Sequence, residues 1–259
     1  LGFFAGHRLT RDDFAVALGG GVVGDMAGFA AAVYLRGIDF VQIPTTLLAQ
    51  VDASVGGKTG CDLPTGKNLA GAFRQPRAVV MDPRLLKTLP PEQFASGMAE
   101  VIKTAAIKDE ELFCHLEDWT LIDVIARSVE IKRGVVERDE FERGERMLLN
   151  FGHTAGHAIE RAYGFEGITH GAAVACGMAA AAEIGHKLGI TPQNAEESLR
   201  EALIRHGLPT GTAVKRSEMM DGIAGDKKRT GGAINFVVLE KIGAARTVKL
   251  ELEQLAALL

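Results

Sequence analysis

The hydrophobic positions divide the chain into a first part with short apolar runs and a second part with helical spacing. Residues 14–18 and 40–44 are short apolar runs bounded by polar residues or glycine, which is typical of buried strands, and residues 77–81 form a third. After Asp82 and Pro83, apolar residues recur every three or four positions, which predicts helices. We therefore predict an α/β domain over residues 1–83 and a helical domain over residues 84–259.

Several individual elements follow from this pattern. In the first part, helices are expected at residues 1–6, 26–35 and 47–51. In the second part, helices are expected at residues 91–107, 110–119, 121–136, 145–163, 171–188, 194–206 and 250–259. The apolar run at residues 233–239 is expected to be a strand or another buried extended segment.

A glycine-rich loop follows the first predicted strand directly. Residues 19–25 carry four glycines and an aspartate, and a helix is predicted just beyond them. Strand, glycine loop and helix N-terminus together form a cradle for phosphate, because backbone N–H groups converge there without side chains in the way. The spacing also fits Gly-x-Gly-x-x-Gly, with Asp39 about twenty residues further on, as in dinucleotide-binding folds. The alternative is a glycine turn kept for tight packing.

A second polar, glycine-rich stretch covers residues 52–60 and contains Asp52 and Lys58. Gly66, Lys67 and Asn68 follow shortly afterwards. Loops of this composition commonly hold phosphates and sugars.

Histidines gather in one segment of the helical part. His153 and His157 are four residues apart, so both point from one helix face, and His170 follows soon after. This spacing suits two metal ligands, whereas hydrogen-bonded core histidines are the alternative. A carboxylate ligand is also needed, and Glu100 lies inside an apolar helical run. Four further polar residues crowd the histidine segment: Glu142, Arg146, Asn150 and Glu160.

Composition narrows the class of protein. The chain has 259 residues, 47% of them hydrophobic, which is enough to bury a large core. A net charge of -4 and a pI near 6.0 argue against a general nucleic-acid binder. No apolar run reaches the roughly 18 residues of a membrane span, and no signal peptide is present, so no membrane partner is expected. Three cysteines without metal-type spacing are expected to be reduced thiols in a cytoplasmic protein.

Several long motifs, in order, carry a resemblance to a known family. They lie at residues 19–25, 34–37, 43–52, 54–60, 66–68, 97–103 and 148–160. Together they resemble the 3-dehydroquinate synthase family over essentially the whole chain. The resemblance implies a multidomain α and β protein, with an α/β NAD-binding domain, an all-α metal-binding domain and a homodimer with its active site in the cleft between the domains. It also implies that the first part of the NAD domain is absent and that this chain alone binds NAD weakly.

The resemblance implies a role for each matching residue. Glu100, His153 and His170 become the ligands of a zinc or cobalt ion, and His157 becomes a pocket residue instead of a ligand. The implied catalytic residues are His157, Lys58, Lys103, Lys132, Glu142, Arg146 and Asn150. The implied substrate-binding residues are Asp52, Lys67, Asn68, Lys227, Lys228 and Arg36, the last in the neighbouring subunit's site. The implied NAD contacts are Gly20, Gly21, Val22, Asp25, Thr45, Thr46, Asp52, Lys58, Lys67 and Thr88. Asp39 receives no role.

The implied reaction converts 3-deoxy-arabino-heptulosonate 7-phosphate into 3-dehydroquinate and phosphate. NAD oxidises one carbon transiently, phosphate is eliminated, the hydride returns, and an aldol step closes the ring. Five cations suit such an anionic substrate: Lys58, Lys67, Lys103, Lys132 and Arg146.

Three alternatives stay open: a related sugar-phosphate cyclase, a metal-dependent polyol dehydrogenase, and a truncated, inactive binding protein. One departure from the family pattern is Ala172, where an acid is usual. We expect this change to remove a hydrogen bond near the metal.

Overall fold

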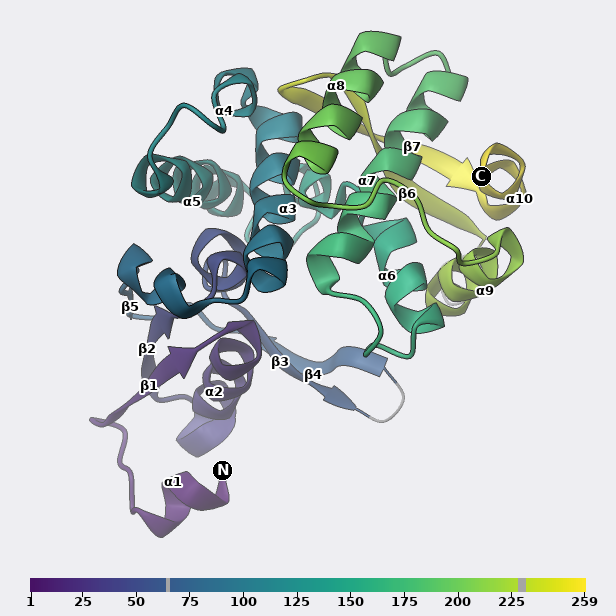
Figure 1. Ribbon diagram of the computed structural model, residues 1–259. Helices are drawn as coiled ribbons and strands as arrows, with labels where there is room; N and C mark the ends of the chain where they lie inside the picture. Colours follow the sequence, from purple (N-terminus) through teal and green to yellow (C-terminus); the bar gives the residue numbers. More distant parts are fainter. Residues whose placement is uncertain (64–65, 228–231) are drawn as a thin grey trace. The chain divides into compact units, whose positions relative to one another are not determined.

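The computed structural model describes residues 1–63, 66–227 and 232–259, with only the backbone described at residues 66–67 and 225–227. It contains two compact units (Figure 1). Unit 1 comprises Leu1–Gly97 together with Leu121–Phe141, and unit 2 comprises Met98–Thr120 together with Glu142–Leu259. The units are not continuous in sequence, because residues 121–141 return to unit 1. The predicted domain boundary after residue 83 stays a prediction.

Unit 1 is built on a parallel sheet. Strands β1 (Phe14–Gly19), β2 (Asp39–Pro44) and β5 (Ala78–Val79) lie in the order β1-β2-β5. β1 and β2 run parallel, from Phe14 opposite Asp39 to Gly19 opposite Pro44. Helix α2 (Gly21–Val33) and the short η1 (Tyr34–Arg36) connect them. The predicted strand–glycine loop–helix unit is present.

Helix α2 begins five residues earlier than its predicted start at residue 26, because the glycine loop itself forms the first turn, with Gly20 at the N-cap. Two later glycines allow the helix to lie close to its neighbours. A Cβ on Gly24 would lie 2.5 Å from Oε1 of Gln42, and one on Gly28 would lie 2.6 Å from Cγ2 of Thr59. Tight packing therefore explains part of the glycine pattern.

The polar stretch predicted as a loop forms a hairpin instead. Strands β3 (Lys58–Leu63) and β4 (Gly66–Phe73) pair antiparallel, with Lys58 opposite Phe73. Thr59 donates a side-chain hydrogen bond of 2.8 Å to the carbonyl of Ala72. Both strands are rich in small residues and lack the alternation of apolar and polar positions that predicts a strand, so the sequence pattern did not indicate them. The rest of unit 1 contains α1 (Gly2–Gly6), the π-helical turn η2 (Ala49–Ala53), η3 (Pro83–Thr88), the start of α3 (Pro91–Lys108) up to Gly97, and α5 (Leu121–Arg138).

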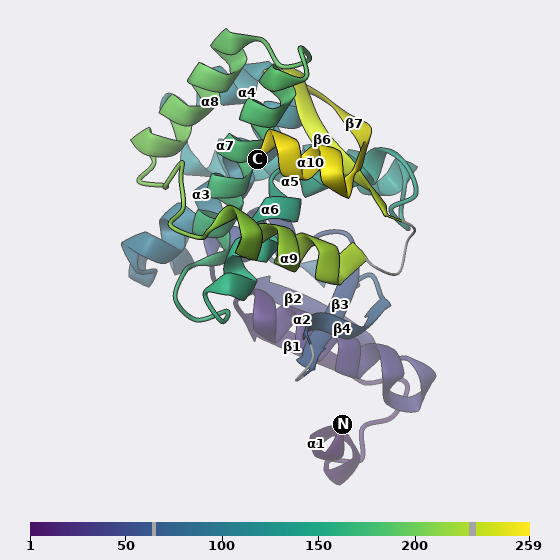
Figure 2. The same ribbon diagram turned by 90° about the vertical axis from the view of Figure 1, so that its right-hand side faces the viewer.

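Unit 2 is mainly helical. Its helices are the part of α3 (Pro91–Lys108) from Met98 onward, α4 (Glu110–Cys114), α6 (His153–Ala162), α7 (His170–Lys187), α8 (Gln193–Arg205), α9 (Arg216–Lys227) and α10 (Leu252–Leu258). α7 is buried along most of its length and packs against α6, α8 and β6 (Figure 2). Strands β6 (Ala233–Lys241) and β7 (Ala244–Glu251) form an antiparallel hairpin.

Four sequence predictions in this unit were wrong. The helix expected over residues 110–119 ends at Cys114. The helix expected over residues 145–163 is broken into η4 (Glu145–Asn150) and α6, because Phe151 and Gly152 leave helical geometry. Residues 250–251 end β7 instead of starting the last helix, since the hairpin register continues to Glu251. Helix α9 was not predicted, because its sequence shows no clear amphipathic pattern. The predicted fold class, an α/β part followed by a helical part, is confirmed, and none of the described helices is long and apolar enough to span a bilayer.

Candidate metal centre and active site

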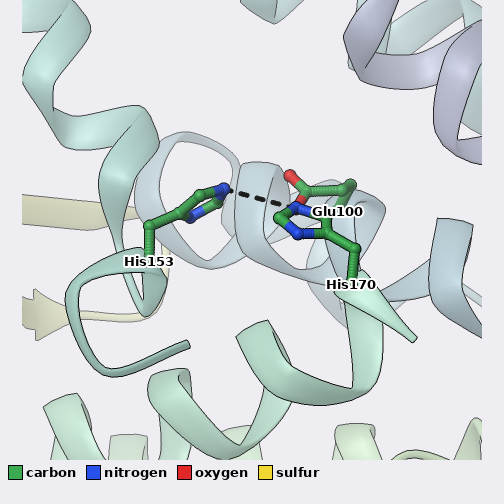
Figure 3. A group of neighbouring side chains, drawn as sticks. All are labelled: Glu100, His153 and His170. Carbon is green, nitrogen blue, oxygen red and sulfur yellow. Dashed lines mark ion pairs between the residues drawn. The ribbon is translucent and has the colours of Figure 1, made fainter. Parts of the chain in front are cut away.

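Glu100, His153 and His170 converge in unit 2 from three different helices. Glu100 lies in α3, while His153 and His170 are the first residues of α6 and α7 (Figure 3). Oε1 of Glu100 lies 3.7 Å from Nε2 of His153 and 3.4 Å from Nε2 of His170. One ligand atom from each residue lies within 4.8 Å of the other two. One carboxylate and two imidazoles form a donor set that binds zinc with a coordination position left open.

The break before α6 places His153. Gly152 has a φ of 79°, a left-handed conformation that glycine adopts without strain. A Cβ at this position would lie 2.5 Å from Cγ of Met178 and 2.8 Å from its backbone N. Helix α7 therefore approaches the corner so closely that only glycine fits, and His153 starts a new helix.

Both imidazoles present the same nitrogen to Glu100. Nδ1 of His153 lies 3.2 Å from the carbonyl oxygen of Phe151, and Nδ1 of His170 lies 3.4 Å from Oε1 of Glu160. An acceptor at Nδ1 holds a proton there and leaves the lone pair on Nε2 for a metal.

The two imidazoles differ in pKa. Burial, followed by the nearby charge of Lys103, lowers the pKa of His153 to about 3, so this ring is neutral and ready to ligate. Burial would also lower the pKa of His170, but the carboxylates of Glu100 and Glu160 outweigh it and raise that pKa to about 9. A metal bound at neutral pH therefore displaces a proton from His170.

Glu100 fits a cation. Its side chain is fully buried, and burial alone would raise its pKa, but the Lys103 ammonium and the two imidazoles hold that pKa well below its usual range. Within the described residues, neither carboxylate oxygen makes a hydrogen bond of normal geometry, although Lys103 contacts Oε2. The buried carboxylate thus carries its negative charge beside one ammonium and two imidazoles, and its Oε1 atom faces both rings, where a metal ion shared with them would lie.

His157 lies next to this group but is exposed. Its ring centroid is 5.3 Å from that of His153 and 6.1 Å from that of His170. His157, Glu160 and His170 form a second group with ligand atoms within 4.8 Å of one another. The structure thus brings all three histidines of the predicted segment together.

Three further predicted residues lie near each other in unit 2. Glu142 accepts a short hydrogen bond from Nδ2 of Asn150, and Glu142 itself has a φ of 59°. Arg146, in η4 between them, is buried. Left-handed backbone at a non-glycine residue costs about 1–3 kcal/mol and often marks a functional segment.

Unit 1 holds a separate polar group at the carboxyl ends of β1 and β2. Gly20 and Gly21 follow β1, and Thr45 and Thr46 follow β2. Thr45 donates a backbone hydrogen bond of 2.9 Å to Gly19. Ligands of parallel sheets bind at this edge.

Lys132, Asp52 and Asp25 complete that polar group. Nζ of Lys132 lies 2.8 Å from Oδ1 of Asp52 and donates to the backbone oxygen of the same residue. Burial raises the pKa of Asp25 to about 7; Lys132 opposes this, and the carboxylates of Asp52 and Asp62 add to it.

Comparison with known proteins identifies the family to which the chain belongs. A model of the 3-dehydroquinate synthase N-terminal region matches residues 2–96, and one of the C-terminal region matches residues 97–229. The chain is 48% identical over 255 residues to the 3-dehydroquinate synthase of Clostridium beijerinckii, covering 95% of this chain and 73% of the relative. It is 46% identical over 266 residues to that of Enterococcus faecalis, covering 99% and 74%. The chain belongs to the 3-dehydroquinate synthase family.

Solved structures agree with this placement. The 2-epi-5-epi-valiolone synthase of Streptomyces hygroscopicus, bound to NAD+ and Zn2+, has a TM-score of 0.90 at 27% identity, with 99% of this chain and 75% of that chain covered. A 2-deoxy-scyllo-inosose synthase complexed with carbaglucose-6-phosphate, NAD+ and Co2+ has a TM-score of 0.89 at 27% identity, with 99% and 76% covered. A probable glycerol dehydrogenase from Sinorhizobium meliloti, at 16% identity and a TM-score of 0.62 over 99% and 77%, shares the fold alone.

Asp39 fitted the spacing of a dinucleotide-binding acid, but it lies away from the glycine loop. It is the first residue of β2, at the opposite end from the glycine loop. Its carboxylate pairs with Arg74 at 3.3 Å and Arg77 at 2.8 Å. Asp39 therefore has the sequence spacing of the dinucleotide fingerprint, but it lies at the end of β2 that is far from the glycine loop.

Most of the remaining family positions lie in different elements of unit 1. Lys58 begins β3, Asn68 lies in β4 and Thr88 ends η3. Val22 is exposed on the first turn of α2, and Arg36 has a left-handed φ of 69° at the end of η1. The Lys67 and Lys227 side chains and all of Lys228 lie outside the described residues.

The structure shows where Ala172, which departs from the 3-dehydroquinate synthase pattern, lies in the fold. Ala172 lies in the first turn of α7, and its N–H donates to the side chain of the N-cap residue Thr169 at 3.3 Å. An acid here would stand at the third position of a capping box. The carboxylate beside His170 comes from Glu160 instead. Sequence analysis gave Glu160 no role, although its seven-residue spacing from His153 places both on one helix face.

Proposed function

We propose that this protein is a 3-dehydroquinate synthase, which converts 3-deoxy-arabino-heptulosonate 7-phosphate into 3-dehydroquinate and inorganic phosphate. The observation that carries the proposal is 48% identity, over 95% of the chain, to a curated enzyme of that name. The solved cyclases that bear other names reach 27% identity.

In this proposal Glu100, His153 and His170 hold a divalent zinc or cobalt ion. Such an ion supplies positive charge that lowers the pKa of a substrate hydroxyl. The buried Glu100 oxygens and the Nδ1 contacts of both histidines support this assignment. His157, exposed beside the group, would exchange a proton with the substrate.

NAD would bind at the carboxyl ends of β1 and β2. When bound there, NAD would supply reversible hydride transfer. The glycine turn supports this site, since it directly follows β1 at the carboxyl ends of two parallel strands and precedes the N-terminus of α2. Within the described residues, no side chain caps the N-terminus of α2, which suits a phosphate there.

Cations of the chain would hold the two anionic groups of the substrate. Lys103 and Arg146 are buried in unit 2, and Lys132 is buried in unit 1. Buried cations bind carboxylate and phosphate more strongly than exposed ones, because water screens them less. Asn150 and Glu142, joined by their hydrogen bond, would fix the direction of the segment that carries Arg146.

Assembly and location belong to the same proposal. We infer a homodimer in which Arg36 reaches the neighbouring copy's site, and sedimentation of the protein at several concentrations would test it. The three cysteines are all free thiols, which supports a reducing compartment such as the cytoplasm.

A related sugar-phosphate cyclase is the second candidate. The fold of a 2-epi-5-epi-valiolone synthase superposes with a TM-score of 0.90, so the fold suits both reactions. A panel of phosphorylated sugars, each incubated with NAD and metal, would separate the two activities.

The decisive experiment measures products and cofactor together. The protein is supplied with 3-deoxy-arabino-heptulosonate 7-phosphate, catalytic NAD and zinc or cobalt. We expect phosphate and 3-dehydroquinate in equal amounts, without NADH accumulating. Stoichiometric NADH would indicate a dehydrogenase, and phosphate release that survives removal of both metal and NAD would refute the proposed reaction.

A further inference from the structure

Glu160 is a buried carboxylate that the proposed reaction does not use. Only 2% of the residue is exposed, and it lies near the end of α6. A carboxylate in such a place needs a polar partner, because burying an unpaired charge costs several kcal/mol, as an order of magnitude. Oε1 of Glu160 lies 3.4 Å from Nδ1 of His170.

Close packing of α6 against α7 sets this contact. A Cβ on Gly152 would touch Met178, and a Cβ on Gly156, one turn later, would lie 3.1 Å from Cα of Val174, one turn earlier in α7. The two helices therefore run antiparallel in a register fixed by glycines. One turn further along, the same register brings Glu160 opposite His170.

We propose that Glu160 is a positioning residue for the metal centre. Its carboxylate accepts a hydrogen bond from Nδ1–H of His170 and so directs Nε2 of that ring toward Glu100 and the metal. The carbonyl of Phe151 does the same for His153, whose Nδ1 lies 3.2 Å away. In both imidazole ligands, an oxygen atom thus accepts a hydrogen bond at Nδ1 and orients the ring. The inference rests on the proposed metal ligands.

The second histidine group offers a competing role for Glu160, as a ligand together with His157 and His170. The geometry favours the positioning role. Nε2 of His170 faces Glu100, and one metal ion cannot bind both nitrogens of one ring. Glu160 is also buried, whereas His157, the other member of this second group, is exposed. Oε1 of Glu100, in contrast to Oε1 of Glu160, faces the Nε2 atoms of both His153 and His170.

Metal affinity of the metal-free protein tests the proposal without any turnover. Zinc affinity is measured by competition with a chelator, and cobalt binding by its visible absorption. Glu160→Ala should weaken zinc binding about 10–100-fold, the usual loss when the residue behind a ligand is removed. Glu160→Gln keeps a carbonyl oxygen that accepts from Nδ1–H, so it should recover most of that loss. Glu201→Gln, on the exposed face of α8, is the matched control and should bind like the unchanged protein.

A second measurement on the His170 ring distinguishes positioning by Glu160 from a purely structural role of Glu160 in the fold. In the zinc-loaded protein, zinc on Nε2 fixes the proton of His170 on Nδ1, and the hydrogen bond to Glu160 should slow the exchange of this proton with water. Glu160→Ala should speed this exchange in NMR spectra, while thermal unfolding of the metal-free variant still shows a folded protein. The proposal is overturned if Glu160→Ala binds zinc like the unchanged protein, or if Glu160→Gln and Glu160→Ala lose affinity equally.

Loss of zinc in His157→Ala to the same extent as in His153→Ala would instead make Glu160 a ligand, and would overturn the positioning role. Failure to form 3-dehydroquinate, with the expected pattern of zinc affinities intact, would refute the proposed function and leave this inference standing.

Discussion

His153 and His157 lie one turn apart on the same face of α6, yet their surroundings differ. His153 starts the helix at the corner beside Glu100, whereas His157 is exposed one turn later. Identical residue types four positions apart therefore meet different groups, because their three-dimensional neighbours decide which nitrogen faces which group.

His153→Ala should abolish zinc retention through dialysis, since it removes one of three ligands. His157→Ala should retain zinc and lower kcat by about 10²–10⁴-fold, the usual contribution of a general acid or base. Metal analysis of the dialysed variants, followed by turnover with added zinc, measures both effects. Equal metal loss in the two variants would contradict the assignment of His157.

Asp25 should make stability depend on pH. Its pKa rises from 3.8 unfolded to about 7 folded, mainly through burial, so the folded state holds the proton more tightly. The stabilising contribution is complete below pH 4 and is lost as the pH rises through 7. Asp25→Asn should remove this loss and stabilise the protein above pH 7 by about 1–2 kcal/mol, a figure reduced to allow for partial exposure.

Urea unfolding of Asp25→Asn and of the unchanged protein between pH 4 and pH 8 measures this difference. Asp12→Asn, an exposed change in the same unit, controls for the removal of one charge. A difference that does not grow with pH would contradict the shifted pKa.

At the scale of elements, the corner between η4 and α6 determines the metal centre. Gly152 and the tight contact of its backbone with α7 turn one predicted helix into two. The left-handed turn and the close approach are separate constraints, and a second glycine in the unit lets them be measured apart.

Gly152→Ala should destabilise the protein by about 2–4 kcal/mol, because the added Cβ is both strained and overpacked against Met178. Gly189→Ala is the matched control: its φ is 69°, but no atom lies within 4 Å of the added Cβ, so only the strain of about 1 kcal/mol is expected. Denaturant unfolding of both variants checks this. Equal losses would show that packing against α7 contributes nothing.

For the whole molecule, the first sheet presents an apolar surface. β1 is the end strand of its sheet among the described strands. Phe14, Val16 and Leu18 are 59%, 53% and 61% exposed, alternating with the buried Ala15 and Ala17. An unpaired edge together with such a face favours association.

We expect the protein to associate beyond a dimer as its concentration rises, because this edge and face are exposed. Val16→Lys should reduce the association, because a charge on an edge strand opposes pairing. Light scattering over a concentration series, with the unchanged protein and Val16→Lys side by side, measures the association. A sample of the unchanged protein that stays monodisperse at every concentration would contradict this prediction.

The sequence by itself determined the α/β character of the first part, most helices of the second part, the β1–α2–β2 unit and the family. Periodic apolar residues and a glycine turn are local signals, and local conformation follows from them. The family motifs, in turn, indicate Glu100, His153 and His170 from sequence alone.

Only the tertiary structure decided which distant groups meet. The break at Gly152 and the β3–β4 hairpin depend on how closely other segments approach, and sequence periodicity does not record that distance. Asp39 matched a spacing rule but lies at the far end of its strand, paired with arginines. Glu160 reaches His170 only because glycines set the register of two packed helices, and such a register is fixed by contacts between surfaces and not by either helix alone.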